Sequence, residues 1–304
     1  MTINYKIIRV LFITTAVSLF IHACGGGGSG DTNSSTNTPK GKMSVRVTDA
    51  PIDGVDVKVF VQFSAIELHG SGKTTRIEYD PPKQIELTLL TEGKTADFIN
   101  DLELPAGRYQ WMRLEVDTAQ DLDTYISVNG TPYELSIPSE ERSGLKIVSE
   151  FEVIENKGSI YVIDFDLRKS ITVTVNGLNV NYKLRPTLRL LEEKLVGVIA
   201  GTVDLANYAC DETGNAVYIY DGANQLADDE GSLNPPVTSA QIKYNTETAT
   251  YKYLAAFVNQ GDYTVALTCM ADADNPETND DITFLETHNA SVKKGETTLI
   301  NFPN

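Results

Sequence analysis

The stretch YISVNGTPYELSI (residues 125–137) decides the fold class of this 304-residue chain. Apolar and polar residues alternate on both sides of Asn129-Gly130, and this dipeptide between two alternating runs is the strongest short signal for a β-hairpin. FEVIENKGSIYVIDFDL (151–167) and ITVTVNGLNVNYKL (171–184) predict two further hairpins. Strands at such short intervals are typical of antiparallel sandwiches and barrels. The sequence therefore predicts an all-β protein.

The strand pattern is long enough for two antiparallel β-sandwich-like domains. VKVFVQFSAIEL (57–68) alternates until its phase slips near the serine, as a β-bulge would cause. The polar residues EEK (192–194) separate a closing strand from the first strand of a new unit. We therefore expect one β domain at 42–192 and an immunoglobulin-like or transthyretin-like sandwich at 193–304. A short helix or turn is expected in EGKTADFINDLEL (92–104), with Thr95 as its cap.

The first residues have the pattern of a secretory signal. Lys6 and Arg9 precede an apolar run at 10–21, and the small residue Ala23 follows it. The apolar run is shorter than the roughly 20 residues that a membrane-spanning helix requires. We therefore predict a lipoprotein signal peptide at 1–23 rather than a transmembrane anchor.

Cys24 follows this signal directly. IHAC (21–24) resembles the lipobox of bacterial lipoproteins, in which the cysteine is acylated and becomes the first residue of the mature protein. The resemblance implies lipidation of Cys24, and Gly25 after it implies the outer membrane, on either its periplasmic or its cell-surface face. Residues 24–41 have the Gly/Ser-rich composition of a flexible linker. Secretion without a lipid is the alternative.

Charge and cysteine content narrow the possible partners. The formal net charge is −17, which disfavours binding to the phosphate backbone of nucleic acids. Cys210 and Cys269 would lie in an oxidising compartment, where we expect them to form a disulfide. Such a bridge would stabilise the fold by roughly 4 kcal/mol in the chain-entropy model.

Several segments between about residues 43 and 192 resemble one bacterial lipoprotein family, built on the domain of unknown function 4382. The matching stretches are SVRVTDAPIDGVDVKVFVQFSAIELHG, LPAGRYQWMRLEVD, IPSEERSGLKI, IDFDLRKSI and YKLRPTLRL. The resemblance implies a secreted β domain tethered to the bacterial envelope. It implies no reaction and no catalytic residue.

The C-terminal part resembles carboxypeptidase regulatory-like domains, which have a transthyretin-like β-sandwich fold. The stretches that carry this resemblance are GTVDL, GDYTVAL and KKGETTLINF. Domains of this kind are spacers and binding modules without catalysis of their own. The resemblance therefore implies a non-catalytic sandwich at 193–304.

Residues for covalent catalysis or zinc binding are scarce. Beyond the signal, the histidines are His69 and His288, and neither lies near a nucleophile pattern such as G-x-S-x-G. The chain has no C-x-x-C or H-E-x-x-H spacing that would indicate zinc. We assign no catalytic residue and no certain cofactor.

Two groups of charged residues are candidates for ligand binding. Alternation places Asp164 and Asp166 on the same face of one strand, near the basic side chains of Arg168, Arg185 and Arg189. They would form either a polar groove for a sugar or carboxylate, or a structural ladder of ion pairs. The second group is a loop that contributes Arg142 and Lys146, since loops at the end of a sandwich often contact ligands.

The densest oxygen cluster is CMADADNPETNDDI (269–282), and it is a candidate calcium site. The ligands would be Asp272, Asp274, Glu277, Asp280 and Asp281. The spacing fails the EF-hand rule, so the site would be an irregular loop between strands. A second acidic loop, DGANQLADDEGS (221–232), could approach it. The alternative is a solvated acidic loop without calcium.

Together these patterns favour an envelope-anchored lipoprotein that binds a glycan or protein ligand without catalysis. The alternatives are an accessory hydrolase of envelope or polysaccharide processing, and a structural component of the envelope. The expected partners are the membrane, through the lipid, and one such ligand.

Overall fold

The computed structural model describes residues 38–50, 56–70, 72–117, 122–138, 144–177, 179–211 and 213–303. The described residues belong to one compact unit that begins at Thr38. The predicted signal peptide, Cys24 and Arg142 lie outside the described residues. Among the helices of the described part, none has the length and apolar character required to cross a membrane.

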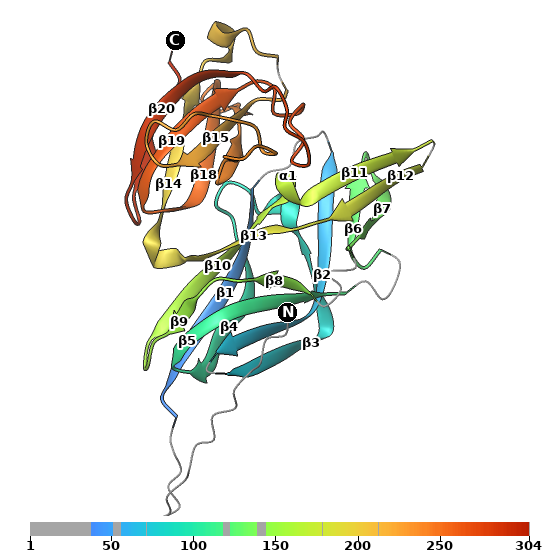
Figure 1. Ribbon diagram of the computed structural model, residues 1–304, viewed down its shortest axis with the longest axis vertical. Helices are drawn as coiled ribbons and strands as arrows, with labels where there is room; N and C mark the ends of the chain where they lie inside the picture. Colours follow the sequence, from blue (N-terminus) through green and yellow to red (C-terminus); the bar gives the residue numbers. More distant parts are fainter. Residues whose placement is uncertain are drawn as a thin grey trace, which may run out of the picture. The chain divides into compact units, whose positions relative to one another are not determined.

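Two sheets form the part of the chain before residue 193 (Figure 1). The first has four strands in the order β13-β10-β1-β4: β1 (Lys40–Ala50), β4 (Ala96–Pro105), β10 (Gly158–Asp166) and β13 (Thr187–Glu192). The second has nine strands: β2 (Val57–Gly70), β3 (Lys73–Glu86), β5 (Gly107–Val116), β6 (Tyr125–Val128), β7 (Thr131–Ser136), β8 (Leu145–Ile147), β9 (Phe151–Val153), β11 (Ile171–Asn176) and β12 (Asn179–Leu184). Within these two sheets, pairing is antiparallel except between β1 and β10 and between β12 and β7.

Two four-stranded sheets form the remainder. One has the order β17-β18-β14-β21: β14 (Val196–Val203), β17 (Lys243–Asn245), β18 (Thr250–Asn259) and β21 (Thr297–Leu299). The other has the order β16-β15-β19-β20: β15 (Ala216–Asp221), β16 (Thr238–Gln241), β19 (Gly261–Thr268) and β20 (Phe284–Val292). Helical segments are short: α1 (Leu167–Ser170), η1 (Leu87–Leu89), η3 (Glu193–Leu195) and η4 (Leu205–Tyr208).

The predicted all-β class is confirmed. The hairpin at 125–137 forms between β6 and β7, and its turn residues Asn129 and Gly130 have φ values of 50° and 76°. These positive values explain the need for asparagine and glycine, which tolerate the left-handed region. The β11–β12 hairpin also forms, and the predicted bulge in β2 is the register shift between Phe63 and Ala65.

One local prediction was wrong and another held only in part. The strands β9 and β10 do not form a hairpin, because β9 pairs with β5 while β10 pairs with β1 and β13. In the segment predicted as a short helix or turn, Glu92 and Gly93 form a turn, but most of the remainder is strand β4, which pairs with β1 and buries Phe98 and Ile99. Burial of these side chains between the sheets favours the strand.

The structure has two large hydrophobic cores, one formed by residues before position 193 and one by residues after it. One core fills the space between the first two sheets, and another fills the space between the last two. Among the described residues, every strand pairing lies wholly before or wholly after residue 193. Independent folding of 42–192 and 193–304 stays a prediction.

Strand β15 is buried on both of its faces. Val217 and Ile219 face the core between the last two sheets, whereas Tyr218 and Tyr220 belong to a small cluster on the opposite face. The loop that follows β19 closes over this second face. It begins at Cys269, which forms the predicted disulfide with Cys210 at a Cα–Cα distance of 5.7 Å.

Candidate functional site

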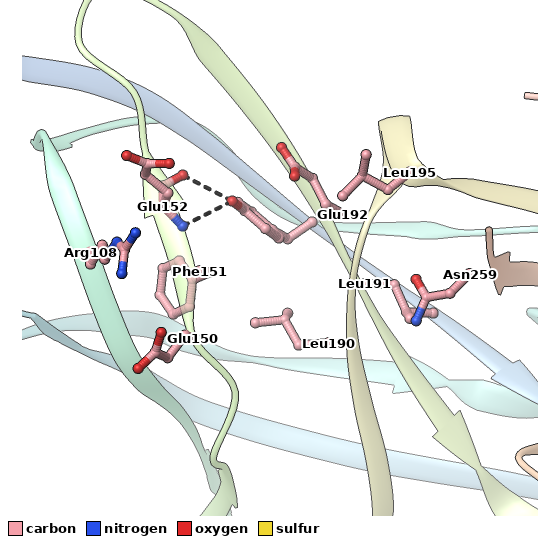
Figure 2. Close-up of a pocket in the computed structure, with 10 residues that line it drawn as sticks. Arg108, Glu150, Phe151, Glu152, Leu190, Leu191, Glu192, Leu195 and Asn259 are labelled. Atoms are coloured by element: carbon pink, nitrogen blue, oxygen red, sulfur yellow. Dashed lines mark hydrogen bonds between the residues drawn. The ribbon is translucent and has the colours of Figure 1, made fainter. Parts of the chain in front are cut away.

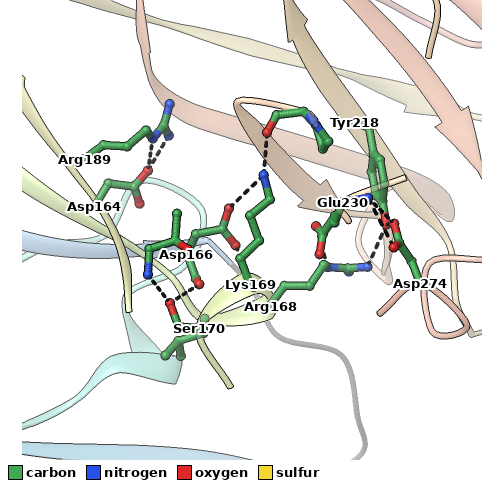
Figure 3. A network of polar contacts seen from close by, with 12 residues as sticks. Asp164, Asp166, Arg168, Lys169, Ser170, Arg189, Tyr218, Glu230 and Asp274 are labelled. Carbon is green, nitrogen blue, oxygen red and sulfur yellow. Dashed lines mark hydrogen bonds and ion pairs between the residues drawn. The ribbon is translucent and has the colours of Figure 1, made fainter. Parts of the chain in front are cut away.

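The candidate site begins where strand β10 ends. Asp166 is the N-cap of α1, and its Oδ1 accepts a hydrogen bond from the Lys169 backbone N–H at 3.3 Å. Aspartate is favoured at this position because its carboxylate satisfies a free N–H group of the first turn. The single turn of α1 directs Arg168 and Lys169 toward the segment between β15 and β16 (Figure 3).

Asp164 forms an ion pair across the first sheet. It lies opposite Arg189 in the register of β10 and β13, and Arg189 Nε donates to Asp164 Oδ2 at 3.1 Å. The carboxylate is buried. This geometry is the cross-strand ion pair that the sequence left open as the structural alternative.

Asp49 lies on β1, the strand next to β10, and its carboxylate is buried with few hydrogen-bond donors. Its Oδ1 accepts from the Leu167 N–H at 3.3 Å, while Oδ2 has no hydrogen-bond partner. Burial raises the pKa of Asp49 well above its usual range, and the charges of Asp164 and Asp166 raise it further. The neutral form is therefore favoured in the folded protein.

Arg168 occupies the centre of the network. Its Nη1 donates to the carbonyl oxygen of Ala271 at 3.0 Å and lies 3.4 Å from the Tyr218 hydroxyl. Its Nε lies 3.8 Å from Glu230 Oε1, and both side chains are buried. Lys169 Nζ donates to the backbone oxygen of Pro236. These contacts connect α1 to the segments after β15 and β19.

The carboxyl groups of Asp274 and Glu230 complete the network around Arg168. Asp274 accepts from the Tyr218 hydroxyl at 2.7 Å and from the Glu230 N–H at 3.1 Å. Burial raises the pKa of Glu230 to about 8, and the charge of Asp166 contributes to the shift. Burial also raises the pKa of Asp274.

A cavity of about 460 Å³ lies beside this network, and we call it the junction cavity. Most of its apolar lining residues come from β2, β6, β11 and β12, and we call these the apolar wall: Val57, Ile126, Val128, Ile171, Val173 and Tyr182. Its polar lining residues come mainly from α1 and the segment between β19 and β20, and we call them the acidic wall: Arg168, Asp272, Asp274, Asn275 and Glu277. The cavity therefore offers both apolar surface and carboxylates.

The structure brings together residues from both predicted groups. Arg168 of the proposed ligand group and Asp272, Asp274 and Glu277 of the proposed calcium group line the same cavity. Arg185 lies next to it through an exposed ion pair with Glu277 at 2.8 Å.

Other predicted residues lie elsewhere. Asp164 and Asp166 are buried beneath α1, and Asp280 and Asp281 do not line the junction cavity. Lys146 lies on β8, with its Nζ 4.7 Å from the centre of the Trp111 ring. Its predicted partner in ligand binding, Arg142, is outside the described residues.

Sequence reasoning missed Glu230, Tyr218 and the apolar wall. The acidic run ADDEG (227–231) was a signal for Glu230, but nothing local indicated that its side chain would be buried. The valines of β11 read as ordinary strand residues. Their role as a cavity wall depends on contacts between segments far apart in the chain.

Two of the other cavities in the described part also have polar linings. One of about 340 Å³ is lined by Arg108, Glu150, Glu152 and Phe151, with the Tyr161 hydroxyl bonded to the Glu152 backbone (Figure 2). The other, of about 590 Å³, lies on β14, β17 and β18, and we call it the tyrosine cavity. Its lining includes Thr202, Lys243, Tyr244, Asn245, Tyr253 and Asn301.

The raised pKa of the buried Asp49 carboxyl group predicts a pH-dependent gain from a neutral substitute. An acid with a raised pKa in the folded state contributes fully below its unfolded pKa, near 3.9, and destabilises the fold as pH rises through the raised value. We expect Asp49→Asn to increase the free energy of unfolding by about 1–3 kcal/mol at pH 7. At pH 3.5 the difference should nearly vanish. Denaturant unfolding at both pH values measures this.

Asp262→Asn is the matched control, because Asp262 is exposed. It should change stability little at either pH. A loss of stability in Asp49→Asn at pH 7, or the same change at both pH values, would contradict the assignment of a buried and poorly compensated acid.

Comparisons with known proteins place part of this chain in a family. No curated protein matches it. The Bacillus anthracis TIE protein is 14% identical with a TM-score of 0.20, over 86% of this chain and 33% of its own. A leucine-rich repeat protein from Bacteroides thetaiotaomicron VPI-5482 is 10% identical with a TM-score of 0.22, over 88% of this chain and 26% of its own. GBS52, the minor pilin of Streptococcus agalactiae, is 9% identical with a TM-score of 0.19, over 86% of this chain and 94% of its own.

This chain therefore spans about a third or less of the first two proteins, and TM-scores at this level carry no inference about function. The sequence match is the informative one. Residues 40–186 match the family described as a domain of unknown function, DUF4382. The resemblance seen in the sequence is confirmed over these residues, which include every strand of the first two sheets except β13.

Proposed function

We propose that the protein is a lipid-anchored, non-catalytic binding protein of the bacterial outer membrane, and that the junction cavity holds its ligand. The observation that carries this proposal is the lining of the cavity, which combines apolar strand residues with an acidic loop. A volume of about 460 Å³ lies within the range of ligand sites, roughly 300–1,000 Å³. Sites at the junction of two packed units are also a common location for ligands.

The chemistry of the two walls selects a class of ligand. Val128, Ile171 and Val173 offer surface to an aliphatic or aromatic group, and Asp272 and Glu277 attract a positive charge. A protein segment that carries an apolar side chain beside a lysine or arginine satisfies both walls. The net charge of −17 would accelerate the approach of such a segment.

Glu230 is the residue that would most readily suggest catalysis. A carboxylic acid held protonated near neutral pH is a feature of general acids. However, its side chain is fully buried against Arg168 and does not line the junction cavity. We therefore assign Glu230 a structural role, and a hydrolase remains the alternative that a substrate panel would reveal.

Binding of a cationic, apolar peptide should depend on both walls. Peptides selected from a random phage-displayed library against residues 38–304 provide the probe, with affinity measured by fluorescence anisotropy. We expect Val173→Ser and Glu277→Gln each to weaken binding about fivefold to tenfold, or about 1–1.4 kcal/mol. Val173 is 53% exposed, so its replacement should not disturb the core.

Val175→Ser and Glu247→Gln are matched controls. Val175 lies on the same strand and is 63% exposed, but it does not line the cavity. Selected peptides that bind all four variants equally, or that carry no basic residue, would contradict the proposed ligand class.

The tyrosine cavity favours a second candidate function, glycan binding. Tyr244 is 53% exposed and packs edge-on against Tyr251 at a centroid distance of 5.1 Å. Asn245, Asn301 and Lys243 add hydrogen-bonding groups around it. An exposed aromatic ring beside amides is suited to a sugar, because the ring covers the apolar face of the sugar while the amides bond its hydroxyls.

A glycan array tests this second function separately. If the cavity binds a glycan, Tyr244→Ala should reduce the array signal at least about fivefold because the stacking surface is lost. Tyr125→Ala, a half-buried tyrosine of β6, should leave the signal unchanged. An array without signal for the unmodified protein would remove glycan binding as a candidate.

The anchor is tested through Cys24. A single acyl chain holds a protein to a membrane only marginally, whereas two or more anchor it stably. We expect the full chain expressed in bacteria to incorporate labelled palmitate and to fractionate with outer membranes, and Cys24→Ala to lose the label and become soluble. Unchanged labelling in Cys24→Ala would contradict the anchor.

A further inference from the structure

Asp274, which accepts the hydrogen bond of the Tyr218 hydroxyl, also belongs to a group of three aspartates. One carboxylate oxygen from each of Asp229, Asp274 and Asp280 lies within 4.8 Å of the others. Asp229 comes from the segment between β15 and β16, and the other two come from the segment between β19 and β20. The cluster therefore joins two loops that are far apart in the sequence.

Asp229 provides an independent indication that this cluster has a ligand. Its side chain is fully buried, and its Oδ1 accepts from the Gly231 N–H at 2.8 Å. Its Oδ2 is also buried and has no hydrogen-bond partner among the described residues. A buried carboxylate oxygen without a donor is costly unless a cation compensates it.

Among the described residues, no basic side chain forms an ion pair with Asp229 or Asp274. Asp229, Glu230 and Asp274 are all buried, and neither oxygen of Glu230 accepts a hydrogen bond. The charges of Arg168 and Lys169 act on Glu230, and Arg168 Nε lies 3.8 Å from Glu230 Oε1. The Arg168 charge also reaches Asp274, so Asp229 is the buried acid of this group that these basic side chains compensate least.

The chemistry of the ligands favours calcium. Calcium takes six to eight oxygen ligands, carboxylates among them, at about 2.3–2.6 Å in a flexible geometry. Magnesium needs near-octahedral geometry, dehydrates reluctantly and usually keeps several waters, so a site built from three protein carboxylates suits it less well. Backbone oxygen is also close: a Cβ on Gly231 would lie 1.7 Å from the Thr278 carbonyl oxygen, so the two loops touch here.

We propose that Asp229, Asp274 and Asp280 bind one calcium ion that joins the two loops. Asp274 and Asp280 were among the residues expected from the sequence, whereas Asp229 comes from the second acidic loop. Asp272, Glu277 and Asp281 lie outside the group. Because Asp274 also lines the junction cavity, the ion would fix the acidic wall of that cavity. The site does not require that the cavity bind a ligand.

The test uses the full mature protein purified in detergent and treated with a chelator. Isothermal titration with Ca²⁺ alone should give one site with a Kd at or below about 1 mM, the range of extracellular calcium modules. Calcium at 100 times that Kd should raise the thermal midpoint by at least about 4 °C. Mg²⁺ should bind at least about tenfold more weakly, because it gives up its bound water reluctantly and needs near-octahedral geometry.

Variants separate this site from a diffuse acidic surface. Asp229→Asn and Asp280→Asn should each weaken calcium binding at least about tenfold, and the partly exposed Asp280 keeps the test valid if the buried variant fails to fold. Asp281→Asn is the matched control in the same segment and should bind calcium as the unmodified protein does.

Three results would overturn the proposal. The first is the absence of both heat and a midpoint shift with calcium, and the second is equal binding of magnesium. The third is an equal loss of affinity in the control variant. A change in peptide binding without a change in calcium binding would bear on the proposed function alone.

Discussion

The buried guanidinium of Arg168 is the contact on which the arrangement of the candidate site depends. Arg168 lies on the single turn of α1, directly after β10. Its guanidinium donates to the Ala271 carbonyl oxygen, lies over the Tyr218 ring and pairs with Glu230. Removal of one member of a buried pair leaves the other charge uncompensated, at a cost of about 3–5 kcal/mol. The end of β10 and the loops after β15 and β19 are therefore held in one arrangement. The junction cavity exists because that arrangement is fixed.

This constraint also explains an unusual strand. Along β15, alternate residues such as Tyr218 would ordinarily face solvent, since its other face already packs into the core between the last two sheets. Instead Tyr218 and Tyr220 are fully buried, covered by the loops that Arg168 holds. Their hydroxyls bond Asp274 and the Asp228 backbone, so burial leaves no polar group unpaired on these rings. The packing of apolar rings and the pairing of charge support each other here.

The sequence was informative where the determining contacts are local. A turn such as Asn129-Gly130 specifies its own hairpin, because the backbone conformation that it needs is encoded in those two residues. The disulfide between Cys210 and Cys269 was predictable because few cysteines were available to pair. The ion pair of Asp164 could be proposed as one of two alternatives, but its partner depended on the register of β10 against β13, which puts Arg189 opposite it.

Predictions that depend on distant contacts failed or were incomplete. Strand β9 lies close to β10 in the sequence, yet its pairing with β5 is set by the packing of Phe151 against Tyr109, whose rings stack at 5.0 Å. The segment that contains β4 was predicted as a short helix or turn, but Phe98 packs edge-on against Phe63, and this buried contact favours the strand. The three-aspartate group shows the same limit: the sequence identified an acidic loop, while the position of Asp229 depends on how two loops meet.

The buried acids of this protein are accommodated in three different ways. Asp164 is compensated by a guanidinium across the sheet, at the cost of burying two charges. Asp49 has one backbone donor and no cation of its own, so burial raises its pKa and a proton neutralises it. Asp229 has one backbone donor as well, but it lies among other carboxylates at the meeting point of two loops, where one divalent cation could compensate several of them at once. The acids beside Asp49 have cations of their own, because Asp164 pairs with Arg189 and Asp166 with Lys169. Among the described residues, Asp229 and Asp274 have no such ion pair, and this difference is the physical reason to expect a metal at Asp229 and not at Asp49.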